Sequence, residues 1–166
     1  MKEIRFEQDI LPLKDKLFRL AMRITLNREE AEDIVQDTLI RLWNLKDEWH
    51  KISNVETYAL TICRNHALDS IEKRERRNVS LDETFHDRPD FSSQPDEQLI
   101  GRQQQERVEQ IINHLPEKQR TALQLRDMEG KTYSEIAEAM QISVSDVKVN
   151  IFRARQTLRD RLLTRQ

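Results

Sequence analysis

Glycine and proline are scarce in this chain, whose 166 residues include 2 Gly and 4 Pro. Tight turns and strand ends need these residues most, because glycine supplies positive φ angles and proline fixes turn geometry. Charged residues make up 35% of the sequence, yet the apolar residues recur in periodic clusters, so we expect a folded chain. The composition therefore predicts an all-α fold of long helices joined by short loops.

Cysteine is also nearly absent, since the chain has only Cys63, which lies inside a helical pattern. One cysteine can form no disulfide within the chain and no cysteine metal cluster. The four histidines are spread over different segments, and no phosphate-binding loop or metal-ligand spacing occurs. We therefore expect no cofactor, no metal, no catalytic residue and no enzymatic activity.

No apolar run approaches the roughly 18 residues that a membrane-spanning helix needs, and the first residues do not resemble a leader peptide. These absences predict a cytoplasmic protein. The formal net charge of -2 gives no sign of nucleic-acid binding. Basic residues are nevertheless concentrated at 73–77 and 141–166, which fits a protein that touches DNA at particular places.

Apolar spacings of three and four predict helices over 9–26, from Asn27 to about 43, and from about 55 to 77. This periodicity stops at 78–96, where acidic residues and two prolines accumulate. We interpret the sequence as two small helical domains, at 1–77 and 97–166, joined by a flexible acidic linker at 78–96. The acidic residues of this linker could simply keep it solvated, as a plain tether between the two domains.

Closely spaced helix starts indicate a helix-turn-helix in the second domain. Gly130 is expected to end one helix in a left-handed conformation, and Thr132 with Glu135 forms a capping box for the next. Ser143 begins a further helix, and Gln141 stands where such turns often carry glycine. The outer face of the last helix carries basic residues and could enter a DNA major groove, although a helical hairpin with a solvated basic face gives a similar pattern.

Two sets of motifs resemble a known family. The second domain closely resembles the fourth region of RNA polymerase sigma factors, which binds the promoter -35 element. The resemblance lies in the segments 115–120, 125–130, 133–137 and 147–158. Residues 31–43 and 62–69 resemble the second sigma region, which binds polymerase and melts the -10 element. No third domain lies between them, so the chain resembles the small extracytoplasmic-function (ECF) type within the sigma-70 superfamily.

The resemblance implies a role in directing core RNA polymerase to promoters, with promoter DNA and an anti-sigma factor, either free or membrane-bound, as further partners. It assigns three groups of site residues. The core polymerase would contact Asp33, Gln36 and Asp37; the -10 element would contact Trp49, Tyr58, Arg64, Asn65, Arg74, Arg76 and Arg77; and the -35 element would contact Arg126, Lys148, Val149, Phe152, Arg153 and Arg155.

Several of these assignments have simpler structural alternatives. Trp49 and Tyr58 could be packing residues, Arg155 could form a salt bridge within its domain, and the acidic positions could belong to a solvated helix face. Val149 replaces a residue that is commonly small and polar in the family, so the sequence does not predict which bases are recognised. A DNA-binding regulator that acts without polymerase, as a dimer on palindromic sites, remains the main rival, and a helical adaptor remains another.

Overall fold

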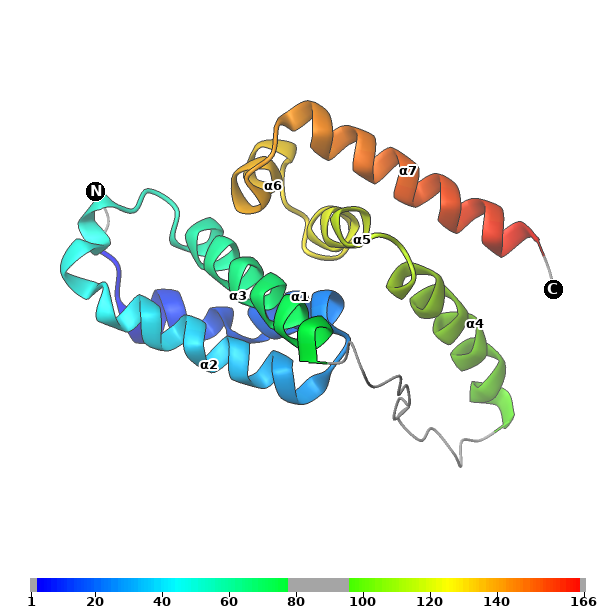
Figure 1. The fold of residues 1–166 in the computed structure, drawn as a ribbon, viewed down its shortest axis with the longest axis horizontal. Coiled ribbons are helices and arrows are strands. Elements are labelled where there is room, and N and C mark those ends of the chain that lie inside the picture. The colour runs from blue at the N-terminus through cyan, green and yellow to red at the C-terminus, as the bar shows by residue number, and fades with distance from the viewer. Residues whose placement is uncertain (1–2, 78–95, 165–166) are drawn as a thin grey trace.

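A computed structural model describes residues 3–77 and 96–164, and these residues contain helices and loops but no strand. The linker predicted at 78–96 lies outside the described residues except for Asp96, where a helix begins. Figure 1 shows the helices in two groups, one before and one after this segment in the sequence. The elements are η1 (Phe6–Ile10), η2 (Leu11–Leu13), α1 (Lys14–Thr25), α2 (Arg28–Asn44), η3 (Lys46–Lys51), α3 (Val55–Arg77), α4 (Asp96–Asn113), α5 (Glu117–Leu123), η4 (Gln124–Met128), α6 (Tyr133–Met140) and α7 (Val144–Leu163).

Helices α1, α2 and α3 pack together as the first domain. As predicted, Asn27 caps α2, because its side chain accepts a 2.9 Å hydrogen bond from the Glu30 amide. The helix predicted over 9–26 is instead divided into η1, η2 and α1. Pro12 lies at the start of the 3₁₀ turn, where its missing N–H does not interrupt a continuous α-helix.

The second domain consists of α4 to α7. Pro116 is the N-cap residue of α5, and this helix continues directly into the π-helical turn η4. Gly130 has a φ of 70°, as the left-handed cap requires. The capping box is present in both directions, since Glu135 N–H donates to the Thr132 hydroxyl and Thr132 N–H donates to the Glu135 carboxylate.

Gln141 forms the turn between α6 and α7 and has a φ of 60°. This left-handed conformation costs a residue with a Cβ roughly 1–2 kcal/mol, which glycine avoids while losing about 0.5–1 kcal/mol of chain entropy. The Gln141 side chain is exposed. We therefore predict that Gln141→Gly stabilises the protein by about 0.5–1 kcal/mol, raising Tm by roughly 1–4 °C in a thermal melt followed by circular dichroism. Gln141→Ala keeps the strain, so an equal gain from alanine would contradict this explanation.

The two domains pack against each other. Helix α3 lies beside α6, and α1 lies beside α5 (Figure 1). Buried residues of both domains belong to one apolar cluster, which includes Leu20 and Cys63 of the first and Leu125, Ile136 and Met140 of the second. The flexible linker predicted from the sequence therefore joins two domains that share part of their core.

Candidate polymerase and nucleic-acid interfaces

The exposed face of α2 carries the three residues predicted to bind core polymerase. Asp33, Gln36 and Asp37 are all exposed, whereas Ile34 and Val35 are buried in the first domain. Positions three and four apart share a helix face, so the two carboxylates and the amide form one acidic surface. The structure thus brings this predicted set together on an accessible face.

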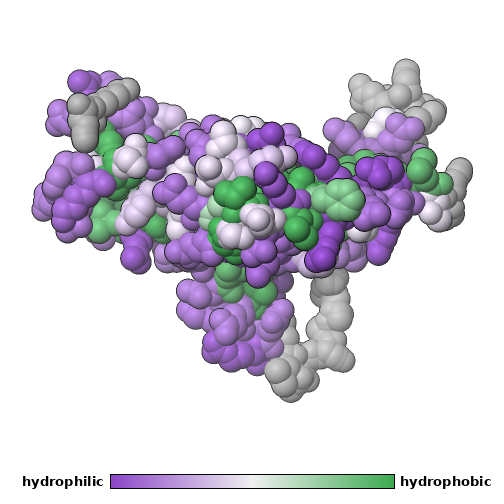
Figure 2. All heavy atoms as spheres, turned by 90° about the horizontal axis from the view of Figure 1, so that it is seen from above, coloured by the Kyte–Doolittle hydropathy of each residue, from purple (hydrophilic) through white to green (hydrophobic). Residues whose placement is uncertain are grey.

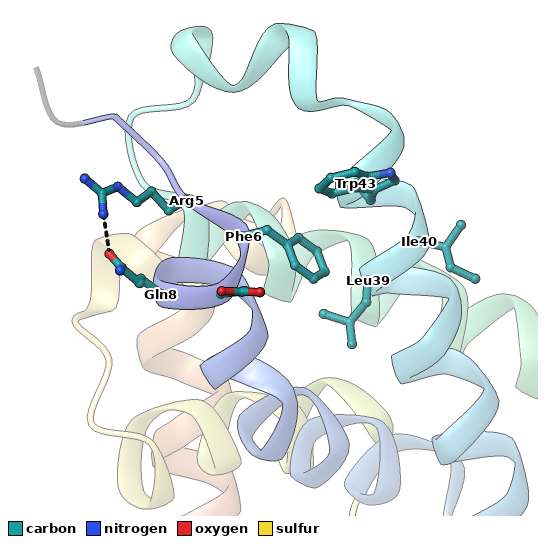
Figure 3. Close-up of a pocket in the computed structure, with 7 residues that line it drawn as sticks. Arg5, Phe6, Gln8, Leu39, Ile40 and Trp43 are labelled. Atoms are coloured by element: carbon teal, nitrogen blue, oxygen red, sulfur yellow. Dashed lines mark hydrogen bonds between the residues drawn. The ribbon is translucent and has the colours of Figure 1, made fainter.

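The same helix face continues as an apolar groove that the sequence interpretation missed. Ile40 and Trp43 are 56% and 46% exposed. Phe6 points from η1 toward α2, where its ring meets Trp43 edge-on with 5.3 Å between centroids (Figure 3). Leu39 and Ile40 line the groove, which has a volume of about 770 Å³. The sequence did contain a signal for this groove: Ile40 and Trp43 follow Gln36 at spacings of four and seven residues, which places them on the same helix face as the acidic residues.

The residues predicted to contact the -10 element are distributed unevenly. Asn65 is exposed on α3, and Tyr58 is partly exposed beside a cavity of about 230 Å³. Trp49 is half-buried; its Nε1 donates a 2.9 Å hydrogen bond to the Leu42 carbonyl and its ring packs edge-on against Trp43. Trp49 thus packs against the end of α2, as the structural alternative for this residue expected.

The basic residues of α3 also differ in their surroundings. Arg64 is 6% exposed and is held by residues of the second domain. Arg74 is half-buried and donates to the Thr25 carbonyl and to Glu30, so it stabilises the end of α1. Arg76 and Arg77 are exposed, and Arg76 lies 3.8 Å from Glu72. Of the four arginines predicted to contact the -10 element, Arg76 and Arg77 are thus the exposed ones.

The outer face of α7 is accessible. Lys148, Val149 and Arg153 are exposed, and Phe152 is 64% exposed. Val147, Ile151 and Ala154 are buried on the opposite side of the helix. One face of the helix is thus buried in the second domain. The other face is exposed to solvent and carries two cations and two apolar side chains. Figure 2 shows apolar side chains at a few places on an otherwise hydrophilic surface.

Two predicted DNA-binding arginines have partners in the second domain. Arg126 donates to the Lys131 carbonyl and its guanidinium lies 4.3 Å from the centre of the Tyr133 ring, which Lys148 approaches at 5.5 Å. Arg155 forms a two-point salt bridge with Asp127, whose hydrogen bonds raise the pKa of Arg155. The salt bridge within the domain that the sequence suggested for Arg155 is therefore present.

The described part of the chain offers no sign of a metal or a redox site. No group of three or more His, Cys, Asp and Glu side chains lies close enough there to hold a metal ion. Burial raises the pKa of the Cys63 thiol to about 12, so this cysteine is an unreactive core residue. None of the helices described has the length and apolar character needed to cross a membrane.

Comparison with known proteins matches both halves of the chain. The family models for sigma-70 region 2 and sigma-70 region 4 match residues 10–77 and 105–158, respectively. The RNA polymerase sigma-H factor of Pseudomonas aeruginosa is 30% identical over 161 residues, which cover 92% of this chain and 83% of that protein. Two further relatives, 30% identical over 89% and 90% of this chain, are ECF RNA polymerase sigma factors. The chain belongs to the ECF family of RNA polymerase sigma factors. Proteins of this family recognise promoters and initiate transcription, and so does this sigma factor.

Further relatives support the assignment. The ECF RNA polymerase sigma factor SigW of Bacillus subtilis is 30% identical over 158 residues, covering 90% of this sigma factor and 84% of its relative. The solved structure of the sigma factor RpoE of Bartonella quintana, in complex with the anti-sigma factor NepR, matches with a TM-score of 0.75 and 27% identity over 97% and 98% of the two chains. CnrH, solved with the cytosolic domain of CnrY, shares the fold at 21% identity, with a TM-score of 0.67.

Proposed function

We propose that this sigma factor docks on core polymerase through the α2 face and places α3 and α7 on the two promoter elements. The observation that carries the proposal is the separate exposure of two surfaces of different chemistry. The acidic and apolar face of α2 suits a protein partner, since aromatic side chains are enriched in protein interfaces. The basic outer face of α7 suits a DNA major groove, where lysine and arginine bind purine edges or phosphates.

Each group of residues has its own binding role. Asp33, Gln36 and Asp37 contact core polymerase, and the neighbouring Ile40 and Trp43 extend that contact. In the second domain Lys148, Val149, Phe152 and Arg153 read the -35 element, with Arg126 beside them and Arg155 fixing α7 to η4. In the first domain the -10 strand is held by Tyr58, Arg64, Asn65, Arg76 and Arg77, while Trp49 and Arg74 support the fold around them.

No covalent step is assigned to this chain, because polymerase forms the RNA and the sigma factor acts by binding alone. The proposed domains are 1–77 and 97–166, joined by 78–96. We place the protein in the cytoplasm, where bacterial polymerase and promoters are found. An anti-sigma factor is a further proposed partner, since the similar sigma factor of Bartonella quintana was solved in complex with one.

Transcription in vitro tests the proposal. Core polymerase from the same bacterium is incubated with pooled genomic fragments, with and without this protein, and the RNA start sites are mapped. We expect new, discrete start sites that depend on the added chain and share sequence elements near -35 and -10. A protein that neither creates new starts nor co-elutes with core polymerase on gel filtration would instead be a regulator acting without polymerase.

A further inference from the structure

Arg64 is enclosed where the two domains meet. Its Nε and Nη2 atoms each donate a 3.0 Å hydrogen bond to the Glu117 carboxylate, and Nη1 donates a 3.0 Å hydrogen bond to the Met140 carbonyl. Arg64 comes from α3 of the first domain, whereas Glu117 and Met140 belong to α5 and α6 of the second. All three guanidinium nitrogens are therefore engaged by the opposite domain.

The Glu117 carboxylate accepts two hydrogen bonds from Arg64, the arrangement that a phosphate group would also adopt. A guanidinium binds carboxylates and phosphates with the same paired, parallel hydrogen bonds. Thr121, one helical turn further along α5, donates a 2.7 Å hydrogen bond to Glu117 and so fixes the carboxylate in place. Because one guanidinium edge holds one such anion, Glu117 and a DNA phosphate exclude each other at Arg64.

Other ion pairs cross the same interface. Arg19 of α1 donates at 2.8 and 2.9 Å to Glu129, and Glu56 of α3 pairs with Lys131. Burial acts to raise the pKa of Glu129, but the hydrogen bonds from Arg19 and Gln124 outweigh it, and the pKa lies below its ordinary value. The side chain of Glu129 is almost fully covered. Such a covered carboxylate stabilises the contact only while Arg19 faces it.

One arginine of the second domain binds the backbone of the first. Arg120 donates hydrogen bonds of 2.8 and 2.7 Å to the carbonyls of Arg23 and Ile24, at the end of α1, and one of 2.8 Å to the Leu115 carbonyl. Helix-terminal carbonyls have no partner within their own helix, so Arg120 satisfies groups that would otherwise need water. Burial lowers the pKa of Arg120.

We infer that the second domain is an intramolecular inhibitor of the first: in the free protein Glu117 occupies Arg64, and the domains must separate before Arg64 can bind single-stranded DNA. The inference rests on the proposed role of Arg64 at the -10 element. It goes beyond that role by assigning Glu117 as a competitor of the DNA backbone, with the ion pairs of Arg19 and Glu56 holding the closed arrangement.

The comparison with the Bartonella sigma factor agrees with this arrangement. A TM-score of 0.75 over 97% of the chain requires both domains to match together, since neither domain alone spans that much of the chain. That sigma factor was solved with an anti-sigma factor. In the present chain the two domains meet through its own side chains, with Arg64 and Glu117 in direct contact.

Domain closure is measured in the free protein by energy transfer between two dyes. The dyes are attached to Glu29→Cys on α2 and Arg159→Cys on α7, both exposed positions. Cys63 is buried with a thiol pKa of about 12 and stays unlabelled at neutral pH. The decisive variant is Arg19→Glu, which sets a second carboxylate against Glu129. The same samples are titrated with a single-stranded DNA oligonucleotide of mixed sequence.

We expect Arg19→Glu to lower energy transfer and to raise DNA affinity about fivefold or more, within the usual range of coupling between sites. The gain is expected even though the variant is more negative by two charges, which alone weakens DNA binding. Adding Glu129→Arg restores the ion pair in reverse and should restore both closure and weak binding. Arg28→Glu makes the same charge change on α2, away from the interface, and should leave energy transfer unchanged.

Two results would overturn the inference: low energy transfer in the unaltered protein, or domain opening by Arg19→Glu without any gain in DNA affinity. Transcription with saturating core polymerase separates this failure from failure of the proposed function. If the unaltered chain directs new start sites while opening leaves DNA affinity unchanged, the protein is a sigma factor without this inhibition. If no start sites appear, the function itself is wrong, whatever the energy transfer shows.

Discussion

Asp33→Ala combined with Gln36→Ala should reduce affinity for core polymerase about 100-fold and abolish the new start sites at limiting protein. Removing one partner of an interfacial charge contact costs about 2–5 kcal/mol, and losing an amide hydrogen bond adds about 1 kcal/mol. Each factor of ten corresponds to about 1.4 kcal/mol, so a hundredfold loss is a conservative expectation. Affinity is measured by fluorescence anisotropy of the labelled chain against core polymerase, and activity by mapped starts.

The double variant should fold normally, because both side chains are exposed and neither contributes to the buried side of α2. An unchanged thermal melt checks this. A matched control is Gln156→Ala with Asp160→Ala, which removes the same two residue types from exposed positions of α7. If both double variants weaken polymerase binding equally, or if neither does, the α2 face is not the docking site.

Lys148→Ala combined with Arg153→Ala should leave polymerase binding intact but lower transcription from promoters with a -35 element about 100-fold. Each specific contact to a base edge contributes about 1–3 kcal/mol, and each phosphate contact contributes a salt-dependent share. Both side chains lie on the exposed side of α7, opposite the buried Val147 and Ile151. Run-off transcription from the mapped promoters, at two salt concentrations, measures the loss.

The control for this prediction removes the same charge from the same helix. Arg159→Ala with Arg161→Ala lies near the end of α7, beyond the residues that we place in the groove, and both positions are exposed. We expect this variant to weaken transcription only slightly and equally on all promoters. Equal losses from the two pairs would show that α7 attracts DNA by general charge alone and reads no sequence.

Local features of the fold were predictable from the sequence because their causes are local. Asn27, Thr132 with Glu135, and Gly130 each satisfy or shape backbone groups within a few residues, so the residue types alone indicate them. For Gln141 the sequence left open a looser turn or a left-handed residue, and the structure shows the left-handed residue. The division of the first predicted helix did not, because apolar periodicity outweighed Pro12, and the π-helical turn of η4 has no sequence signal that we used.

The exposure of the candidate site residues was predictable where it follows from helical periodicity. Asp33 and its neighbours, and the outer face of α7, could be expected at the surface because the opposite faces are apolar, whereas their roles came from the family resemblance and stay predictions. The burial of Arg64 could not be predicted, because its partners Glu117 and Met140 lie 53 and 76 residues away along the chain. Long-range pairs of this kind depend on how two domains dock, which periodicity does not encode.

Arg120 binds the end of α1 through main-chain atoms of that helix. Its hydrogen bonds end on the main-chain oxygens of Arg23 and Ile24, not on their side chains. Every amino acid supplies that oxygen, so substitutions at positions 23 and 24 that preserve the helix leave these two bonds in place. Substitution at position 23 therefore removes only the hydrogen bonds of the Arg23 side chain to Gln124, Glu109 and Asn113, whereas a polar replacement at position 120 removes the bonds to both main-chain oxygens.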